Sequence, residues 1–134
     1  MVIDTSAVMA ILLGEPEAER IIDAITRDTR RLISAFTVLE CSAVIEARKG
    51  PAGARELDLL LHEGGVELVA MDAEQVGIAR RAYHQYGKGR HPAKLNLGDC
   101  CSYALSIHSG EPLLFKGGDF TKTDVEPVAI PPLQ

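Results

Sequence analysis

Four acidic residues follow short apolar segments or begin longer periodic ones: Asp4, Glu40, Asp99 and Asp119. Carboxylates that are brought together without matching basic residues repel one another, and a hard divalent cation relieves that repulsion. A ligand set made only of oxygen atoms favours Mg²⁺ or Mn²⁺ over zinc. If the fold brings these four acids together, the sequence therefore predicts a site for Mg²⁺ or Mn²⁺.

Three of these acids also have a local explanation at the start of a helix. Thr37 and Glu40 have the spacing of a capping box, and Asp99 could offset the dipole of the helix that it opens. Asp4 or Ser6 could cap the first helix. Caps do not explain why Asp4 stands directly at the end of the first apolar segment, so both interpretations stay open.

The elements that must position these acids alternate along the chain. Five apolar segments have strand length and are mostly continuous, as in buried parallel strands: Val2–Ile3, Leu32–Ile33, Val66–Val69, Leu113–Phe115 and Val128–Ile130. Helical periodicity lies between them, and two helices, about 37–48 and 52–64, share one connection. This order predicts an α/β fold, a three-layer α/β/α sandwich with a four- or five-stranded parallel sheet. Functional groups in such a sheet collect outside the carboxyl ends of the strands.

Length and composition set the remaining bounds. The chain has 134 residues, of which 46% are apolar and 4% aromatic, which predicts one domain over residues 1–130 and a loose tail over 131–134. No apolar run approaches the roughly 18–20 residues of a membrane span. Because Met1 opens directly onto Val2-Ile3-Asp4, without a basic and then an apolar region, we expect no secretory signal. Cys41, Cys100 and Cys101 form no disulfide framework and fall on predicted helices as core residues. We therefore expect a cytoplasmic protein without membrane contact.

A basic segment interrupts an otherwise acidic chain. The net charge is −5, yet no acid occurs between Glu74 and Asp99. The lysines and arginines in that window are Arg80, Arg81, Lys88, Arg90 and Lys94. The positive charge of these residues could attract an anionic substrate, with Lys88, Arg90 and Lys94 as candidate contacts. The alternative is that the segment is only a solvated helix face and loop. The four histidines have no zinc-binding spacing.

Four segments together carry a family resemblance: Val2–Ala7, Ser34–Glu40, Asn96–Cys100 and Leu113–Phe120. In this order and spacing they resemble the PIN domain and, more narrowly, VapC-type toxins of toxin–antitoxin pairs. The resemblance covers essentially the whole chain. It implies a parallel α/β/α fold and a metal-dependent ribonuclease that hydrolyses RNA phosphodiester bonds. It also implies a homodimer that a cognate VapB-type antitoxin inhibits.

The resemblance also assigns the site residues. The first, second and third acids of the family match Asp4, Glu40 and Asp99, which would act in catalysis and hold Mg²⁺ or Mn²⁺. Thr5 and Ser6 match the hydroxyl-bearing residues that support the first acid.

The fourth acid departs from the family pattern. Many PIN domains carry an acid two residues before an Asp-Phe pair, and Gly117 stands at that place. Asp119 alone remains as the fourth metal ligand and catalytic acid.

Two other functions stay open from the sequence. A phosphoacceptor (receiver-like) signalling domain shares this fold class and could use Lys116, but no aspartate closes the second or third apolar segment. The other is an inactive PIN scaffold that only binds a partner. For a toxin, we expect an antitoxin segment in a groove near helices 17–29 and 37–64, with a basic side chain neutralising the acidic site.

Overall fold

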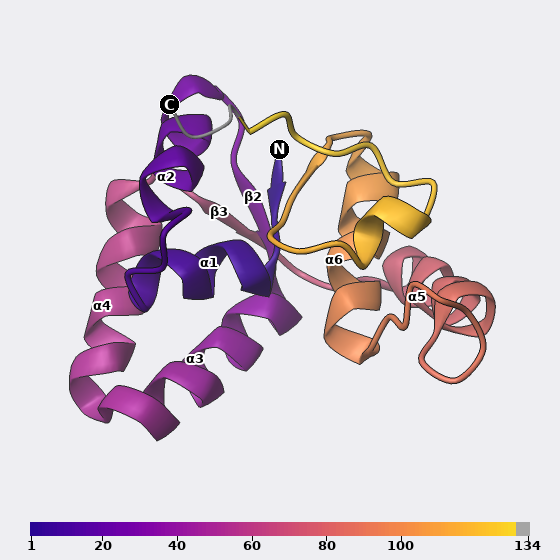
Figure 1. Cartoon of the computed structure of the whole chain (residues 1–134), viewed down its shortest axis with the longest axis horizontal. Coiled ribbons are helices and arrows are strands. Elements are labelled where there is room, and N and C mark those ends of the chain that lie inside the picture. The colour runs from indigo at the N-terminus through magenta and orange to yellow at the C-terminus, as the bar shows by residue number, and fades with distance from the viewer. Residues whose placement is uncertain (131–134) are drawn as a thin grey trace.

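Four short parallel strands form one sheet at the centre of the molecule (Figure 1). The structure, a computed structural model, describes residues 1–130, and the predicted tail at 131–134 lies outside the described residues. The strands are β1 (Val2–Ile3), β2 (Leu32–Ser34), β3 (Glu67–Val69) and β4 (Leu113–Leu114), in the order β3-β2-β1-β4. The helices are α1 (Thr5–Leu12), α2 (Ala18–Arg27), α3 (Ala35–Lys49), α4 (Pro51–Glu63), α5 (Ala73–Tyr86) and α6 (Leu97–Ser109), with a short 3₁₀ helix, η1 (Phe120–Lys122).

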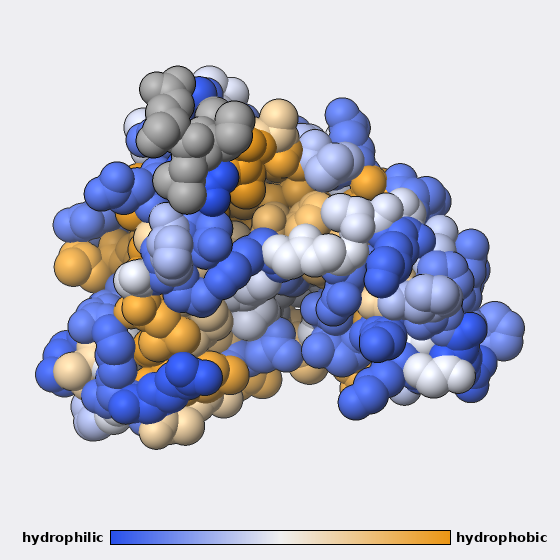
Figure 2. Space-filling view, viewed as in Figure 1, coloured by the Kyte–Doolittle hydropathy of each residue, from blue (hydrophilic) through white to orange (hydrophobic). Residues whose placement is uncertain are grey.

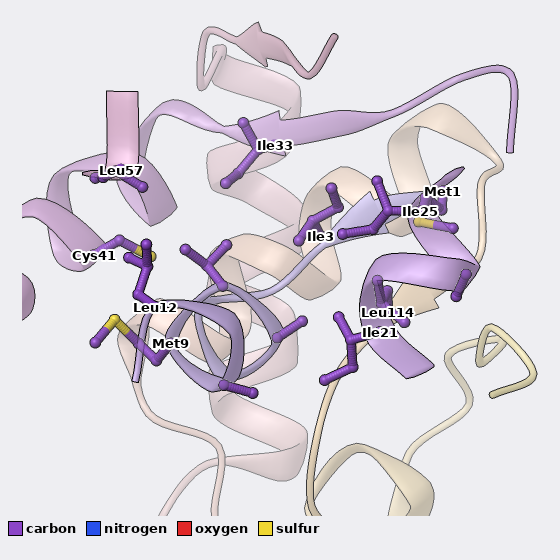
Figure 3. Close-up of a cluster of buried hydrophobic side chains, with 14 of the residues drawn as sticks. Met1, Ile3, Met9, Leu12, Ile21, Ile25, Ile33, Cys41, Leu57 and Leu114 are labelled. Carbon is purple, nitrogen blue, oxygen red and sulfur yellow. The ribbon is translucent and has the colours of Figure 1, made fainter. Parts of the chain in front are cut away.

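Side chains of successive strand residues point to opposite faces of this sheet, and each face has its own buried core. One face carries Ile3, Ile33 and Leu114, which pack with apolar residues of α1, α2, α3 and α4 (Figure 3). The other face carries Val2, Leu32 and Leu113, which pack with residues of α5, α6 and η1. Strands β1, β2 and β4 are buried on both faces, which requires their almost continuous apolar sequence, whereas the edge strand β3 is exposed. The predicted α/β/α sandwich is confirmed.

The sheet has four strands, the lower of the two numbers that the sequence left open. The segment Val128–Ile130 forms no strand. It lies beside β4 through an isolated bridge between Leu113 and Pro127, and the Val128 N–H donates to the Leu113 carbonyl at 2.9 Å. Prolines stand on both sides of this segment and have no N–H to donate to a ladder, so pairing stops after one bridge.

The connections bring three helix starts to one edge of the sheet. Helices α1 and α3 begin directly after β1 and β2, so their first turns lie at the carboxyl ends of these strands. Helix α6 ends just before β4 and returns the chain across the sheet, which places its first turn at the same edge (Figure 1). The carboxyl edge of the sheet is therefore where side chains from distant segments meet.

The remaining features of the fold concern its cysteines and the lengths of its helices. Cys41, Cys100 and Cys101 are buried free thiols, which confirms their prediction as core residues. Among residues 1–130, none of the helices combines the length and apolar character that crossing a membrane requires.

Candidate active site

Asp4 is buried at the carboxyl end of β1. Its exposed fraction is 2%, and its backbone N–H donates to the Leu114 carbonyl of β4 at 3.0 Å. Its carboxylate caps α1, because Oδ2 accepts hydrogen bonds from the Ser6 N–H at 3.0 Å and the Ser6 hydroxyl at 2.7 Å. The Ser6 hydroxyl in turn accepts from the Lys116 N–H at 2.9 Å. The other oxygen, Oδ1, is buried without a hydrogen-bond partner, although most buried polar atoms in folded proteins have one.

Glu40 comes from the second turn of α3, because this helix begins earlier than predicted. Ser34 is the cap, and its hydroxyl accepts from the Phe36 N–H at 3.3 Å. Thr37 is buried inside the helix, where its hydroxyl shares a hydrogen bond with that of Ser102 at 3.2 Å. The capping box expected between Thr37 and Glu40 is therefore wrong, and it does not explain Glu40.

The Glu40 carboxylate lies between the first turns of α1 and α6. The Thr5 hydroxyl donates to Oε1 at 2.5 Å. On the other side the carboxylate touches Gly98, where an added methyl group would lie 2.5 Å from both Glu40 oxygens. Because backbone N–H groups at a helix N-terminus favour negative charge, this is a favourable place for a carboxylate.

Asp99 belongs to a capping box at the start of α6. Its N–H donates to Asn96 Oδ1 at 2.8 Å, and its own Oδ2 accepts from the Asn96 N–H at 3.0 Å. Burial raises the pKa of Asp99 to about 6, opposed by the Asn96 hydrogen bond and reinforced by repulsion from other acids. Those acids are Asp4, Glu40 and Asp119. The four residues that the sequence singled out thus form one electrostatic cluster, and Asp4 and Asp99 are caps as well.

Asp119 is the outer member of the cluster. It is exposed, directly precedes η1 and makes no capping hydrogen bond. Gly117, at the place of the missing acid, has a positive φ of 97°. Lys116 is directed elsewhere: its Nζ pairs with Glu15 and, at 3.3 Å, with Glu17. A phosphoacceptor site would need this lysine beside the acids, so its ion pairs count against that function.

The chemistry of this donor set fits a hard divalent cation. Within residues 1–130, none of the four carboxylates forms an ion pair with a basic side chain. The partnerless Oδ1 of Asp4 and the raised pKa of Asp99 both indicate negative charge that lacks a counter-ion. The described residues do not form a complete cage, since no three acidic, histidine or cysteine side chains there are placed to hold a metal ion. The acids are neighbours with the right chemistry, not a preformed coordination sphere.

The predicted basic contacts are divided between two places. Arg90 turns back to α5, where its guanidinium donates to Nδ1 of His84 at 2.9 Å. An open surface hollow there is lined by Gly77, Arg80, Arg81, Tyr83, His84, Gln85 and Arg90. Lys88 and Lys94 are exposed on the loop that leads to α6. None of these lysines and arginines has an ion-pair partner among the described residues. Figure 2 shows hydrophilic side chains gathered over this end of the molecule.

Some contacts around the site were missed from the sequence. Ser34 and Asn96 are the caps of α3 and α6, and a serine or asparagine just before an apolar periodic segment is the signal that identifies such a cap. Asp124, an exposed residue, accepts a hydrogen bond from the Tyr103 hydroxyl at 2.5 Å and so ties the segment after η1 to α6. No sequence signal indicates that pair, because the two residues meet only through the tertiary fold.

The fold and the acids at the carboxyl edge of its sheet define a known class. Residues 1–126 match the PIN domain, and the chain belongs to the PIN domain family. PIN-domain ribonucleases generally use divalent metal ions.

Within this family the similarity is to VapC ribonucleases. Ribonuclease VapC30 of Mycobacterium tuberculosis is 57% identical over 131 residues, which are 98% of this chain and 100% of the relative. Two solved structures share the fold at lower identity. VapC20 of M. tuberculosis, described as a sarcin-ricin loop cleaving toxin, has a TM-score of 0.78 at 15% identity, with 97% of this chain and 98% of that chain covered. VapBC2 of Rickettsia felis, bound to a fragment of its promoter DNA, has a TM-score of 0.70 at 15% identity, with 90% of each chain covered.

Proposed function

We propose that this chain is a Mg²⁺- or Mn²⁺-dependent endoribonuclease and the toxin of a toxin–antitoxin pair. The observation that carries the proposal is that Asp4, Glu40 and Asp99, from three different helices, lie in one electrostatic cluster in which one oxygen of Asp4 is buried and unsatisfied. Ribonuclease relatives at 57% identity over nearly the whole chain support the same activity. The purified chain should cleave RNA when Mg²⁺ or Mn²⁺ is present. Failure to cleave any RNA under these conditions would favour the inactive scaffold.

In this proposal Asp4 and Asp99 hold the cation, with Asp119 at its outer side. A bound divalent cation polarises the phosphoryl oxygen and lowers the pKa of a water molecule. Glu40 either joins the ligands or accepts a hydrogen bond from the attacking water. Ser6 donates two hydrogen bonds to Oδ2 of Asp4, which leaves Oδ1 without a partner and would make it the oxygen free to bind a cation. Thr5 fixes one oxygen of Glu40.

We further propose that Lys88, Arg90 and Lys94 bind the phosphates of the RNA. They lie on the loop that leads into α6, the helix that carries Asp99. The hollow that Arg90 shares with Arg80 and Arg81 would extend this contact along α5. Basic side chains without an ion-pair partner are available to an external polyanion.

Changing Arg90 and Lys94 together to alanine should weaken RNA binding to the same degree for different RNA sequences. For each phosphate that the variant no longer binds, the slope of log K against log salt should become shallower by about 0.7. Binding should be measured in EDTA over a salt series, so that RNA is not cut. Arg48→Ala with Arg55→Ala, two exposed arginines on α3 and α4, removes the same charge elsewhere and should leave the slope unchanged. If the salt slope of RNA binding were the same for the Arg90/Lys94 variant as for the Arg48/Arg55 variant, the basic segment would be a solvated surface and not an RNA contact.

The antitoxin would bind on the side of α2, α3 and α4. Ile22, Leu39 and Leu59 are apolar residues of these helices with exposed fractions of 42%, 67% and 55%. Figure 2 shows apolar residues at the surface on this side of the molecule. Leu39 directly precedes Glu40, so a segment bound here could place a basic side chain at the acidic cluster. The complex of VapBC2 supports a VapB-type partner.

Ile22→Asp and Leu59→Asp should each raise the antitoxin concentration needed for half inhibition by at least about tenfold, equivalent to about 1.4 kcal/mol of binding free energy. The reason is that each places a charge in a contact that apolar residues make. RNA cleavage by the free variants should equal wild type. Leu68→Asp, on the exposed edge strand β3 at 54% exposure, is the matched control. If the antitoxin inhibited both variants as well as wild type, its proposed binding site on α2, α3 and α4 would be wrong.

We also propose that the chain forms a homodimer. Phe36, Val76 and Leu97 have exposed fractions of 36%, 42% and 62% and line one apolar groove between α3, α5 and α6. A contiguous apolar groove of this kind is typical of protein interfaces. Sedimentation of wild type and of Val76→Asp should show a dimer and a monomer, respectively.

We also propose a domain organisation and a location for the chain. We take residues 1–130 as a single PIN domain, because one sheet separates two cores that share its strands. We place the protein in the cytoplasm, where RNA substrates occur and where buried free thiols such as Cys41 stay reduced.

A further inference from the structure

A glycine in the first turn of α6 touches the Glu40 carboxylate. Gly98 is buried, and a methyl group there would lie 2.5 Å from both Glu40 oxygens and 2.8 Å from Cδ. Real carbon–oxygen contacts are longer, so any larger residue would push the carboxylate away. Among common residues only glycine leaves the space that Glu40 fills.

Local stability gives no reason for a glycine at this position. Glycine is a poor helix former compared with alanine. The positive-φ glycines of the chain do not include Gly98, so its backbone does not require glycine either. The contact with Glu40 is the feature of its surroundings that excludes a side chain.

We propose that Gly98 is a positioning residue that fixes where the Glu40 carboxylate acts. The Thr5 hydroxyl restrains one oxygen from the side of α1, and the missing side chain of Gly98 lets the carboxylate seat against α6. Glu40 is thereby held beside Asp99, the next residue after Gly98. This inference rests on the proposed ribonuclease activity and on a role for Glu40 in it.

The test is Gly98→Ala, alone and combined with Glu40→Asp. In the single variant the added methyl displaces the carboxylate, and we expect kcat/KM for RNA cleavage to fall by at least about tenfold, since a misplacement near 1 Å can cost about 100-fold. The displaced group is the end of a flexible side chain, so the melting temperature should equal or exceed that of wild type. Gly77→Ala, whose methyl would meet only the Arg81 guanidinium at 3.6 Å, controls for the effect of alanine in a helix on melting temperature.

The double variant separates positioning from a structural role. Aspartate is shorter than glutamate by one carbon–carbon bond of about 1.5 Å, which makes room for the methyl group. Gly98→Ala/Glu40→Asp should be at least about threefold more active than Gly98→Ala, although Glu40→Asp alone lowers activity. Activity of Gly98→Ala within twofold of wild type would overturn the proposal. So would a low activity that Glu40→Asp does not improve. If Glu40→Gln kept full activity, the role of Glu40 itself would be wrong, which is a separate result.

Discussion

Replacing Asp4 or Asp99 by asparagine should lower RNA cleavage by more than about 100-fold while the fold persists. Outer partners of metal ligands are worth about 10- to 100-fold, so loss of a carboxylate that holds the cation should exceed that range. Asparagine is as good an N-cap as aspartate at position 4, and at position 99 its amide oxygen can still accept the hydrogen bond from the Asn96 N–H. The measurement is kcat/KM together with circular dichroism of each variant. Asp119→Asn, which changes an exposed residue outside any cap, should lose less activity.

The stability of Asp99→Asn provides an independent check. The pKa of Asp99 is raised from 3.8 to about 6 by burial, so the folded chain binds more protons than the unfolded chain between these values. The free energy of unfolding that depends on Asp99 therefore falls as pH rises from about 4 to about 6. Without metal, Asp99→Asn should melt higher than wild type at pH 7.5, and the difference should shrink at pH 4. Asp99→Ala also removes the capping box and should lose some of this gain. An unfolded Asp99→Asn variant would mean that the residue serves the helix and not catalysis.

Removing divalent cations should abolish cleavage altogether. The four acids form no ion pair with a basic side chain within residues 1–130, so we expect a divalent cation to offset their charge when a phosphate binds beside them. Excess EDTA should stop the reaction, and Mg²⁺ or Mn²⁺ added beyond the chelator should restore it. Undiminished cleavage in EDTA would contradict the metal-dependent mechanism.

A second readout follows cation binding without any reaction. A ligand that binds only the folded chain at 100 times its dissociation constant stabilises it by about 2.7 kcal/mol. Mg²⁺ or Mn²⁺ should therefore raise the melting temperature of wild type. It should do so much less for Asp4→Asn, because the buried Oδ1 of Asp4 is then no longer anionic.

The sheet and the acids could be predicted from the sequence because local patterns encode them. Continuous apolar pairs such as Val2–Ile3 mark strands covered on both faces, and Asp4 follows at once. The sequence left four or five strands open, because the apolar character of Val128–Ile130 does not show whether this segment joins the sheet; the segment meets β4 only through the isolated bridge at Pro127. The start of α3 was misplaced because Thr37 imitates a cap, whereas Ser34 provides it.

Other parts of the site depend on contacts that no local pattern encodes. Arg90, predicted as a substrate contact, lies on the loop before α6 and donates a hydrogen bond to His84 of α5. The contact of Gly98 with Glu40 joins segments 58 residues apart in sequence (98 minus 40). Such pairs follow from tertiary packing, so a single sequence identifies the acids but not what surrounds them.

The pairing of β1 with β4 has a consequence for synthesis on the ribosome. Val2 and Ile3 are translated 111 residues before their sheet neighbours Leu113 and Leu114 (113 minus 2 and 114 minus 3). The N–H of Asp4 bonds to Leu114, and the Lys116 N–H bonds to Ser6, so Asp4 cannot take its final place on a nascent chain that ends before these residues. A nascent chain that ends before Leu114 therefore cannot complete the acidic cluster, so the site that we propose for RNA cleavage forms only after β4 and Lys116 have been translated.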